Sequence, residues 1–237
     1  MKPEETHVLH SSLKNQSILR HLDGDELAYL EKSAEIIHYK KNEIIFLQGK
    51  CIGGCYVVLS GIIKQFKTGI EGKNYIIRLA KPYEILGYRS VLSEEPACHT
   101  SAVIEDSAVY YISKECLHHL LKTNGNFALN LLQIACRELE ETHSLITEIA
   151  QKSVRERLAE LLLMLKNKFG VNENGQLKIT LSREEYANIV GTATESVIRL
   201  LSEFKTDRYI DLIGKKIAIL NEKALERIAA MQKFKIQ

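Results

Sequence analysis

The sequence predicts an α+β protein in which an N-terminal antiparallel β-roll, or jelly roll, precedes a long helix and a C-terminal winged helix-turn-helix domain. Short β-prone runs begin at residue 36, an uninterrupted helical pattern spans residues 127–150, and two short helical segments meet at Gly191. A chain of 237 residues is long enough for two domains with substantial cores. The expected boundaries are 1–123 for the roll with its short N-terminal helices, 124–152 for the long helix and 153–237 for the helix-turn-helix domain.

The N-terminal part is expected to begin with a short helix over residues 21–35 and to continue as strands. Glycines separate the β-prone runs and favour tight turns between them. Many short strands joined by such turns are typical of an antiparallel barrel or jelly roll. The expected strands are 36–39, 43–47, 55–60, 62–67, 75–79, 99–104 and 108–112.

A stripe of side chains, spaced alternately four and three residues apart, runs along the predicted helix 127–150. One interpretation is that the stripe packs against its own domain. We favour pairing with the same helix of a second copy, because a helix-turn-helix normally binds two half-sites as a twofold-symmetric dimer. His143 is then expected to set the register of the pair. The stripe consists of Leu132, Cys136, Leu139, His143, Ile146 and Ala150.

The helix-turn-helix prediction depends on residues 182–201. Ser182 followed by Glu185 forms a capping box, so a helix should start there. Gly191 can adopt the positive φ that a sharp turn needs, and the small Ala187 lets the second helix cross closely over the first. Apolar residues at helical spacing should bury one shared face. They are Tyr186, Ile189, Val190, Val197, Leu200 and Leu201.

Two charged residues of the second helix, Glu195 and Arg199, are expected to face outward. Because they lie four residues apart, they could form an intrahelical pair. We favour contact with bases, since arginine donates to guanine and glutamate accepts from cytosine. Residues 210–220 predict a hairpin, or wing, whose lysines are expected near phosphates; an ordinary charged turn is the alternative. The expected DNA-binding residues are Ser182, Arg183, Thr192, Thr194, Glu195, Ser196, Arg199, Lys215 and Lys216.

Two further helices complete the predicted C-terminal domain. Ser153 can cap a helix over residues 154–168, and Asn221 can cap a last helix over residues 222–231. The leucines of the first helix should form the core beneath the helix-turn-helix. These leucines are Leu158, Leu161, Leu162 and Leu165.

Charge is distributed unevenly along the chain. From residue 151 onward sixteen Lys and Arg face eleven Asp and Glu, whereas the remainder carries sixteen against nineteen. A basic C-terminal part and a mildly acidic N-terminal part are typical of a DNA-binding module attached to a domain that does not contact DNA. No apolar run approaches the roughly 18 residues that span a bilayer, and the N-terminus lacks the pattern of a signal peptide, so we expect a cytoplasmic protein.

The odd number of cysteines and the absence of an export signal indicate reduced thiols. The spacing of Cys51, Cys55 and Cys98 matches no structural zinc pattern, and we expect no metal site. A redox role for these thiols stays open. The five cysteines are Cys51, Cys55, Cys98, Cys116 and Cys136.

The order of roll, long helix and winged helix-turn-helix resembles the Crp/Fnr family of bacterial transcription regulators. Residues 189–201, Ile-Val-Gly-Thr-Ala-Thr-Glu-Ser-Val-Ile-Arg-Leu-Leu, are similar to the recognition motif of that family, with support from residues 56–61 and 85–87. The resemblance implies a homodimer that binds an inverted repeat with a TGA core and responds to a signal in the roll. RNA polymerase is a candidate partner. Thr194 stands where the catabolite activator branch has an arginine, and it is expected near a thymine methyl group.

The same resemblance indicates where an effector would bind. The cyclic-AMP branch uses a glutamate after a glycine and an arginine-serine pair, whereas here Tyr88 follows Gly87 and the pair is Thr100-Ser101. Without that arginine the bidentate phosphate clamp is missing, so we expect no useful affinity for cyclic AMP. Arg89 is near, but on a strand it would point away from Tyr88. The expected effector pocket is Gly87, Tyr88, Arg89, Thr100 and Ser101.

Other signals and functions find less support in the sequence. The oxygen-sensing branch holds an iron–sulfur cluster with N-terminal cysteines, and this chain has none before Cys51, so a cluster is not expected. Haem ligation by one of the eight histidines stays open, and the effector is unknown. A constitutive DNA-binding protein whose roll is only a scaffold is one alternative. A cupin-type metalloenzyme is another. Such an enzyme needs a His-x-His arrangement that faces into the barrel, but His118 and His119 are adjacent in a predicted helix and point in different directions, and His99 stands alone. We therefore expect no enzyme and no catalytic residue.

Overall fold

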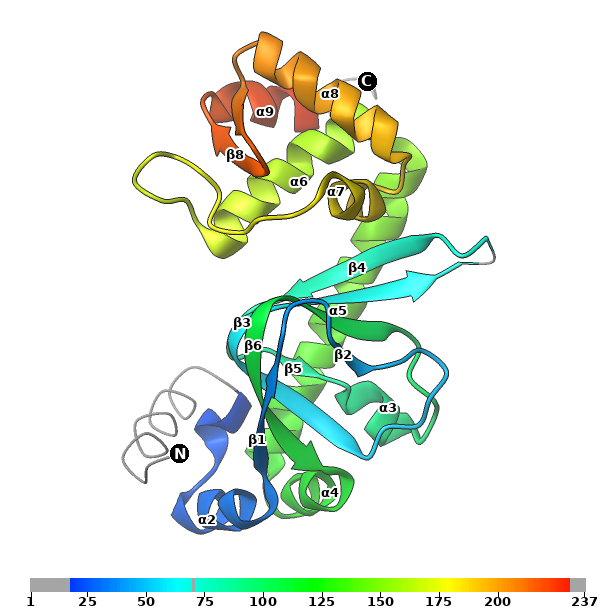
Figure 1. Cartoon of the computed structure of the whole chain (residues 1–237). Helices are drawn as coiled ribbons and strands as arrows, with labels where there is room; N and C mark the ends of the chain where they lie inside the picture. Colours follow the sequence, from blue (N-terminus) through cyan, green and yellow to red (C-terminus); the bar gives the residue numbers. More distant parts are fainter. Residues whose placement is uncertain (1–17, 70, 231–237) are drawn as a thin grey trace. The chain divides into compact units, whose positions relative to one another are not determined.

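A computed structural model describes residues 18–69 and 71–230 (Figure 1). These residues belong to two compact units. The first comprises Met1–Thr68 and Ile77–Glu140, and the second comprises Gly69–Ile76 and Glu141–Gln237. Within the described residues, no helix combines the length and apolar character needed to cross a membrane.

The first unit is built on antiparallel strand pairs, which confirms the predicted class of fold. The strand order is β1-β6-β3-β4, while β2 pairs with β6 and β5 pairs with β3. Its elements are η1 (Ile18–His21), α2 (Gly24–Ser33), β1 (Glu35–Tyr39), β2 (Ile44–Phe46), β3 (Gly54–Thr68), β4 (Asn74–Ala80), β5 (Ile85–Leu86), α3 (Tyr88–Ser93), β6 (Thr100–Ser113), α4 (Lys114–Thr123) and α5 (Gly125–Gln151). The first residues of β4, up to Ile76, and the last turns of α5, from Glu141, belong to the second unit.

Two apolar clusters form the core of this unit. One joins the strands to the helices, with Leu30 of α2, Leu117 of α4 and Phe127 of α5 among its fully buried members. The other lies among the strands and includes Val58 of β3 and Val109 of β6, which are paired in the ladder. Helix α5 therefore starts inside the core of the first unit.

Strands β3 and β6 each continue where the sequence predicted an interruption, so the predicted pairs of strands 55–60 with 62–67 and 99–104 with 108–112 were wrong. Gly61 does not end a strand; it lies within β3 at a φ of +84°. The register of the β3–β6 ladder shifts on both sides of it. A β-bulge accommodates Gly61, and the pairing with β6 continues on both sides of it, so neither strand is interrupted.

Helix α3 was not predicted, and Arg89 lies on this helix and not on a strand. Tyr88 is buried and Arg89 is exposed, so their side chains do diverge. The cause is the turn of a helix and not strand alternation. Gly87, at a φ of +78°, precedes the helix and reverses the chain after β5. A single helical turn and a half is too short to produce a recognisable apolar period.

The second unit contains α6 (Val154–Phe169), α7 (Arg183–Val190), α8 (Thr194–Thr206), β7 (Ile210–Ile213), β8 (Lys216–Ile219) and α9 (Glu222–Ala229). Ser153 caps α6, and the four predicted core leucines of that helix are buried. Asn221 caps α9 by accepting from the amide of Ala224. The predicted end of this helix, at residue 231, lies outside the described residues.

Substituting Gly61 tests the bulge. A Cβ on Gly61 would lie 2.2 Å from Ser107 Oγ and 2.5 Å from the Asp106 carbonyl. We expect Gly61→Ala to lower the free energy of unfolding by roughly 2 kcal/mol or more, because left-handed strain adds to the clash. Gly72→Ala is the control, since Gly72 has a φ of +74° with no atom within 4 Å of the added carbon. Urea unfolding should show the larger loss for Gly61→Ala; equal losses would contradict the steric argument.

Candidate nucleic-acid interface

The first helix of the helix-turn-helix starts and ends as its sequence predicts. Ser182 Oγ accepts from the Glu185 amide at 3.1 Å, and Glu185 Oε2 accepts from the Ser182 amide at 2.8 Å. Gly191 ends α7 at a φ of +72°, and its amide donates to the Ala187 carbonyl. A Cβ at Gly191 would also lie 3.1 Å from the Tyr75 ring. Both the backbone and the space available therefore favour glycine at this turn.

The two helices share a buried apolar face, as predicted. Tyr186 and Val190 of α7 and Val197, Leu200 and Leu201 of α8 are all buried. Ile189 differs from the prediction because it is only half-buried, on the flank of the line that Tyr186 and Val190 form one helical turn apart. Phe204, one turn beyond Leu200, extends the buried face of α8.

The outer face of α8 carries Glu195 and Arg199, and both are exposed. The intrahelical pair weighed for these two residues does not form. Arg199 Nη1 instead contacts Glu203 Oε1 at 2.8 Å, one turn toward the C-terminus. The Arg199 side chain is 69% exposed, so this ion pair contributes little to stability. Arg199 can therefore leave Glu203 for another partner at little cost in free energy. Glu195 forms no hydrogen bond or ion pair with the described residues.

Arg155 of α6, which sequence reasoning missed, holds the C-terminal half of α8. Its guanidinium contacts Glu203 Oε2 at 2.7 Å and Asp207 Oδ2 at 3.1 Å. The same group lies over the Phe204 ring, 4.8 Å from the centroid. No local signal distinguishes Arg155, because its partners are about fifty residues away in the chain. Helix α8 is thus anchored at one end, and the end that carries Glu195 is left open.

Ser182 and Arg183, both predicted to contact DNA, have structural roles in the second unit. The Ser182 hydroxyl accepts the helix cap described above. Arg183 Nη2 donates to the Gly214 carbonyl at 3.3 Å, which ties α7 to the turn between β7 and β8. Arg183 Nη1 is buried without a hydrogen-bond partner among the described residues.

The wing forms where the sequence predicts it. Ile210 pairs with Ile219 and Ile213 with Lys216, and Gly214 adopts a positive φ in the turn. Lys215 and Lys216 are both exposed. Thr192, Thr194 and Ser196, the remaining predicted contacts, are half-buried around the start of α8.

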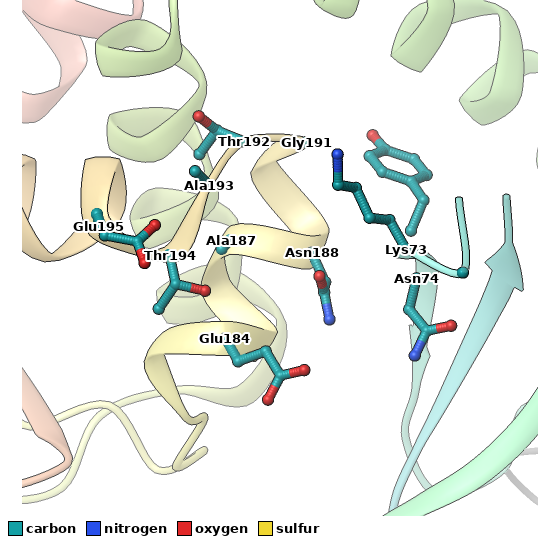
Figure 2. Close-up of a pocket in the computed structure, with 12 residues that line it drawn as sticks. Lys73, Asn74, Glu184, Ala187, Asn188, Gly191, Thr192, Ala193, Thr194 and Glu195 are labelled. Atoms are coloured by element: carbon teal, nitrogen blue, oxygen red, sulfur yellow. The ribbon is translucent and has the colours of Figure 1, made fainter. Parts of the chain in front are cut away.

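A pocket of about 680 Å³ opens beside the turn of the helix-turn-helix (Figure 2). Both of its sides belong to the second unit. Lys73 and Asn74 extend from one side, and Asn188 and Glu184 extend from α7 on the other. Thr192, Thr194 and Glu195 line the same pocket, so the open end of α8 lies at a recess and not on a flat face.

Helix α5 exposes the predicted stripe. Leu132 and Ile146 are each 60% exposed and Leu139 is 55% exposed. The other members, Cys136, His143 and Ala150, are exposed as well. An exposed apolar row of this length on one helix is unusual for a monomer and marks a surface that another chain can cover.

The predicted effector pocket lies partly in a polar network of the first unit. Tyr88 is 2% exposed, and its hydroxyl donates to Glu138 Oε2 of α5 at 2.9 Å. Burial, followed by the charge of Glu138, raises the pKa of Tyr88. Glu138 also accepts from Arg78 of β4, and Arg78 Nη2 contacts Glu84 at 2.8 Å. Sequence reasoning missed Arg78 and Glu138, which come from two distant elements.

The other expected pocket residues have mixed environments. Thr100 and Ser101 are buried at the start of β6, and Gly87 is buried beside α3. Thr100 Oγ1 accepts from the Gln48 amide at 3.1 Å. Ser101 Oγ is buried without a hydrogen-bond partner among the described residues. Arg89 points elsewhere, with Nη2 3.4 Å from Cys98 Sγ.

His99 lies next to these residues and is 6% exposed. Its Nε2 atom is 2.8 Å from Gln65 Nε2. Burial lowers the pKa of His99 to about 4, and the positive charges of Arg89, Arg78 and Lys67 act in the same direction. The ring is therefore neutral at physiological pH. In the part of the chain that the structure describes, no group of three His, Cys, Asp or Glu residues is placed to hold a metal ion.

Comparison with known proteins finds two family models that match this chain. A model of the cyclic nucleotide-binding domain matches residues 36–124, and a model of the Crp-like helix-turn-helix domain matches residues 156–228. The chain is 24% identical over 219 residues to a CRP-like cAMP-activated global transcriptional regulator of Mycobacterium tuberculosis, covering 92% of this chain and 98% of the relative. It is 29% identical over 185 residues to the transcriptional activator protein Anr of Pseudomonas protegens, covering 77% and 75%.

Among solved structures, FixK2 from Bradyrhizobium japonicum superposes with a TM-score of 0.73 at 21% identity. The match covers 82% of this chain and 96% of that one. At this identity the likeness shows the fold alone.

The buried neutral His99 predicts a loss of stability in acid. The unfolded chain binds a proton below about pH 6.5, whereas the folded chain does so only near pH 4. The free energy of unfolding should therefore fall as the pH drops from 6.5 to 4, by up to about 3 kcal/mol from this group. Urea unfolding at both pH values should show a smaller fall for His99→Gln than for the unsubstituted protein. His38→Gln, which removes an exposed histidine of the same unit, is the control; a change equal to that of His99→Gln would contradict the assignment.

Proposed function

We propose, for a chain that belongs to the Crp/Fnr family of transcription regulators, that a homodimer inserts the open end of α8 into the major groove of an inverted-repeat site. The observation that carries this proposal is the recognition helix itself. The Glu195 side chain is exposed and has no hydrogen bond or ion pair with the described residues, Arg199 holds only a weak surface pair, and Arg155 fixes the far end of the helix. Two base-reading side chains are thus presented on a rigid support.

The chemistry of these side chains supports a half-site with a G·C pair. Arg199 can donate twice to guanine O6 and N7, and Glu195 can accept from cytosine N4. The expected half-site contains TGA, with Thr194 near a thymine methyl group. Lys215 and Lys216 of the wing would contact phosphates, which adds affinity without base preference. Thr192 and Ser196 would complete the contacts beside the start of α8.

We propose a smaller contribution to DNA contact for Ser182 and Arg183. The Ser182 hydroxyl and one arm of Arg183 are engaged in holding α7 and the wing turn. Their main contribution would be to position the recognition helix and the wing.

Replacing Arg199 separates base reading from phosphate contact. Binding sites are first selected from random DNA, and affinities are then measured by fluorescence anisotropy. We expect Arg199→Ala to weaken binding to the selected site by about 1–3 kcal/mol and to remove the preference for its guanine. Lys216→Ala should weaken binding to all sequences alike and reduce the salt slope by about 1.

Arg227→Ala is the matched control, because Arg227 is an exposed arginine of the same unit on α9. Arg227→Ala should leave the affinity for DNA and the preference for the guanine unchanged. Selected sites that share no guanine responding to Arg199→Ala would contradict the proposed reading of DNA.

The proposed homodimer would pair the exposed stripe of α5 with its copy. Apolar side chains at heptad spacing bury against each other in this way, and one polar member, His143, would set the register. Twofold symmetry then matches the two halves of an inverted repeat. DNA binding of this kind takes place in the cytoplasm of a bacterium, where RNA polymerase would be the further partner.

A charge on the stripe should separate the two copies. We expect Leu132→Glu to shift the protein from dimer to monomer in sedimentation velocity and to weaken binding to the full inverted repeat. Leu220→Glu is the control, because Leu220 is also 60% exposed but lies outside α5 and its stripe. A dimer that persists with Leu132→Glu at micromolar concentration would contradict pairing through this stripe.

The residues of the roll do not fit cyclic AMP. Where the cyclic-AMP branch has a glutamate, this chain has Tyr88, which is buried and bonded to Glu138. Thr100, which stands in place of the phosphate-binding arginine, carries no charge and accepts from a backbone amide. The nearby Arg78 is paired with two carboxylates. A different effector, or none, would act through this unit.

Calorimetry tests the effector directly. We expect no saturable heat on titrating the full chain with cyclic AMP, since Thr100 stands where the cyclic-AMP branch has the arginine that clamps the phosphate. A dissociation constant in the micromolar range would contradict this. Thermal unfolding screened against haem, other nucleotides and small metabolites then distinguishes a regulated protein from a constitutive one, because a ligand of the folded state raises the midpoint.

A further inference from the structure

An exposed thiol of the first unit lies against two nitrogen atoms. Cys98 precedes β6, and its Sγ is 3.2 Å from His99 Nδ1 and 3.4 Å from Arg89 Nη2 of α3. A guanidinium nitrogen always donates, so Arg89 directs an N–H group and a positive charge at the sulfur. The three residues come together because α3 folds back toward the start of β6.

The proton of His99 is positioned by Gln65 of β3. An amide nitrogen donates and cannot accept, so with Gln65 Nε2 against it His99 Nε2 must accept. Because the ring is neutral, its single proton then lies on Nδ1 and points to Cys98 Sγ. Gln65 and His99 are both buried, at 4% and 6% exposure, which holds this arrangement in place. Two donors thus converge on one sulfur atom.

A further buried polar group lies beside the Gln65–His99 pair. Ser101 lies directly opposite Gln65 in the β3–β6 ladder, so the two side chains share one face of the sheet. Ser101 is fully buried, and its hydroxyl has no hydrogen-bond partner among the described residues. Buried polar groups are normally paired. The interior next to the Gln65–His99 pair therefore keeps an unused hydrogen-bonding group.

We propose that Cys98 is an oxidant-sensitive thiol that reacts with hydroperoxides. The sulfur attacks one oxygen of the peroxide, an S–O bond forms and the O–O bond breaks. Sulfur loses two electrons to the peroxide, and the thiol proton passes to the departing oxygen. Hydrogen peroxide then yields sulfenic acid and water. Arg89 and His99 stabilise the negative charge that develops on the sulfur and the departing oxygen, which lowers the barrier.

The other cysteines lack this combination of an exposed thiol and two neighbouring hydrogen-bond donors. Cys55 and Cys116 are buried, and burial raises the pKa of each thiol, that of Cys55 to about 12. Cys51 and Cys136 are exposed, yet neither forms a hydrogen bond with the described residues. Cys136 also belongs to the α5 stripe, which the proposed dimer would cover. Cys51 is therefore the matched control within the same chain.

The test is a short pulse of hydrogen peroxide on the reduced full chain, with dimedone present to trap sulfenic acid and mass spectrometry to assign it. We expect the trapped adduct to form about tenfold faster at Cys98 than at Cys51, since charge-assisted hydrogen bonds are the stronger ones. Arg89→Gln should bring the rate at Cys98 toward that at Cys51 and leave Cys51 unchanged. Arg89 is exposed, and an unchanged thermal midpoint verifies that this variant is folded.

Gln65→Leu is a second, independent test, because it removes the donor that places the His99 proton on Nδ1. A slower reaction at Cys98, with Cys51 again unchanged, supports the proposal. Equal rates at Cys98 and Cys51 in the unsubstituted protein would overturn it. An Arg89→Gln variant that is folded and reacts as fast as before at Cys98 would overturn it as well.

Discussion

The left-handed turn at Gly191 is the constraint on which the interface depends. Only a residue without Cβ adopts this φ beside the Tyr75 ring without strain, and the turn sets how α8 leaves α7. The buried faces of both helices then meet, and the opposite face of α8 is turned outward. Arg155 completes the arrangement by binding the last turns of α8 from α6. One end of the recognition helix is rigidly held, and the other is available for contact.

Helix α5 connects two kinds of packing. Its first turns are buried in the core of the first unit through Phe127 and Leu131, whereas its later turns expose an apolar stripe. Glu138 lies on the same helix, adjacent to Leu139 of the stripe, and accepts from both Arg78 and Tyr88. A change among the polar groups of the roll would therefore act on the segment that is proposed to pair. This is a physical route by which a signal in the roll could reach the dimer contact.

Polar groups in the interior of the roll are costly to the fold. Gln65, His99, Thr100 and Ser101 are all buried near one end of the β3–β6 ladder. Burying such groups is unfavourable unless each is hydrogen-bonded, and Ser101 Oγ has no such bond among the described residues. Gln65, His99 and Thr100 each have a hydrogen-bond partner, so Ser101 is the residue of this group whose burial is the most costly.

The sequence by itself determined those features whose causes are local. The cap at Ser153, the capping box at Ser182, the turn at Gly191, the wing turn at Gly214 and the stripe of α5 all follow from local sequence patterns, and each appears where it was predicted. Local patterns also sufficed to indicate the family, because its recognition motif is one continuous segment.

Only the tertiary structure decided which distant groups meet. The continuity of β3 through Gly61 depends on its pairing with β6, and Arg155 of α6 meets Glu203 of α8 only because the fold brings the two helices together. Glu138 meets Tyr88 and Arg78, and Cys98 meets Arg89, through the folding of separate elements onto one another. Such contacts carry no periodicity or spacing in the chain. They arise from packing in three dimensions, so no pattern of neighbouring residues could have revealed them.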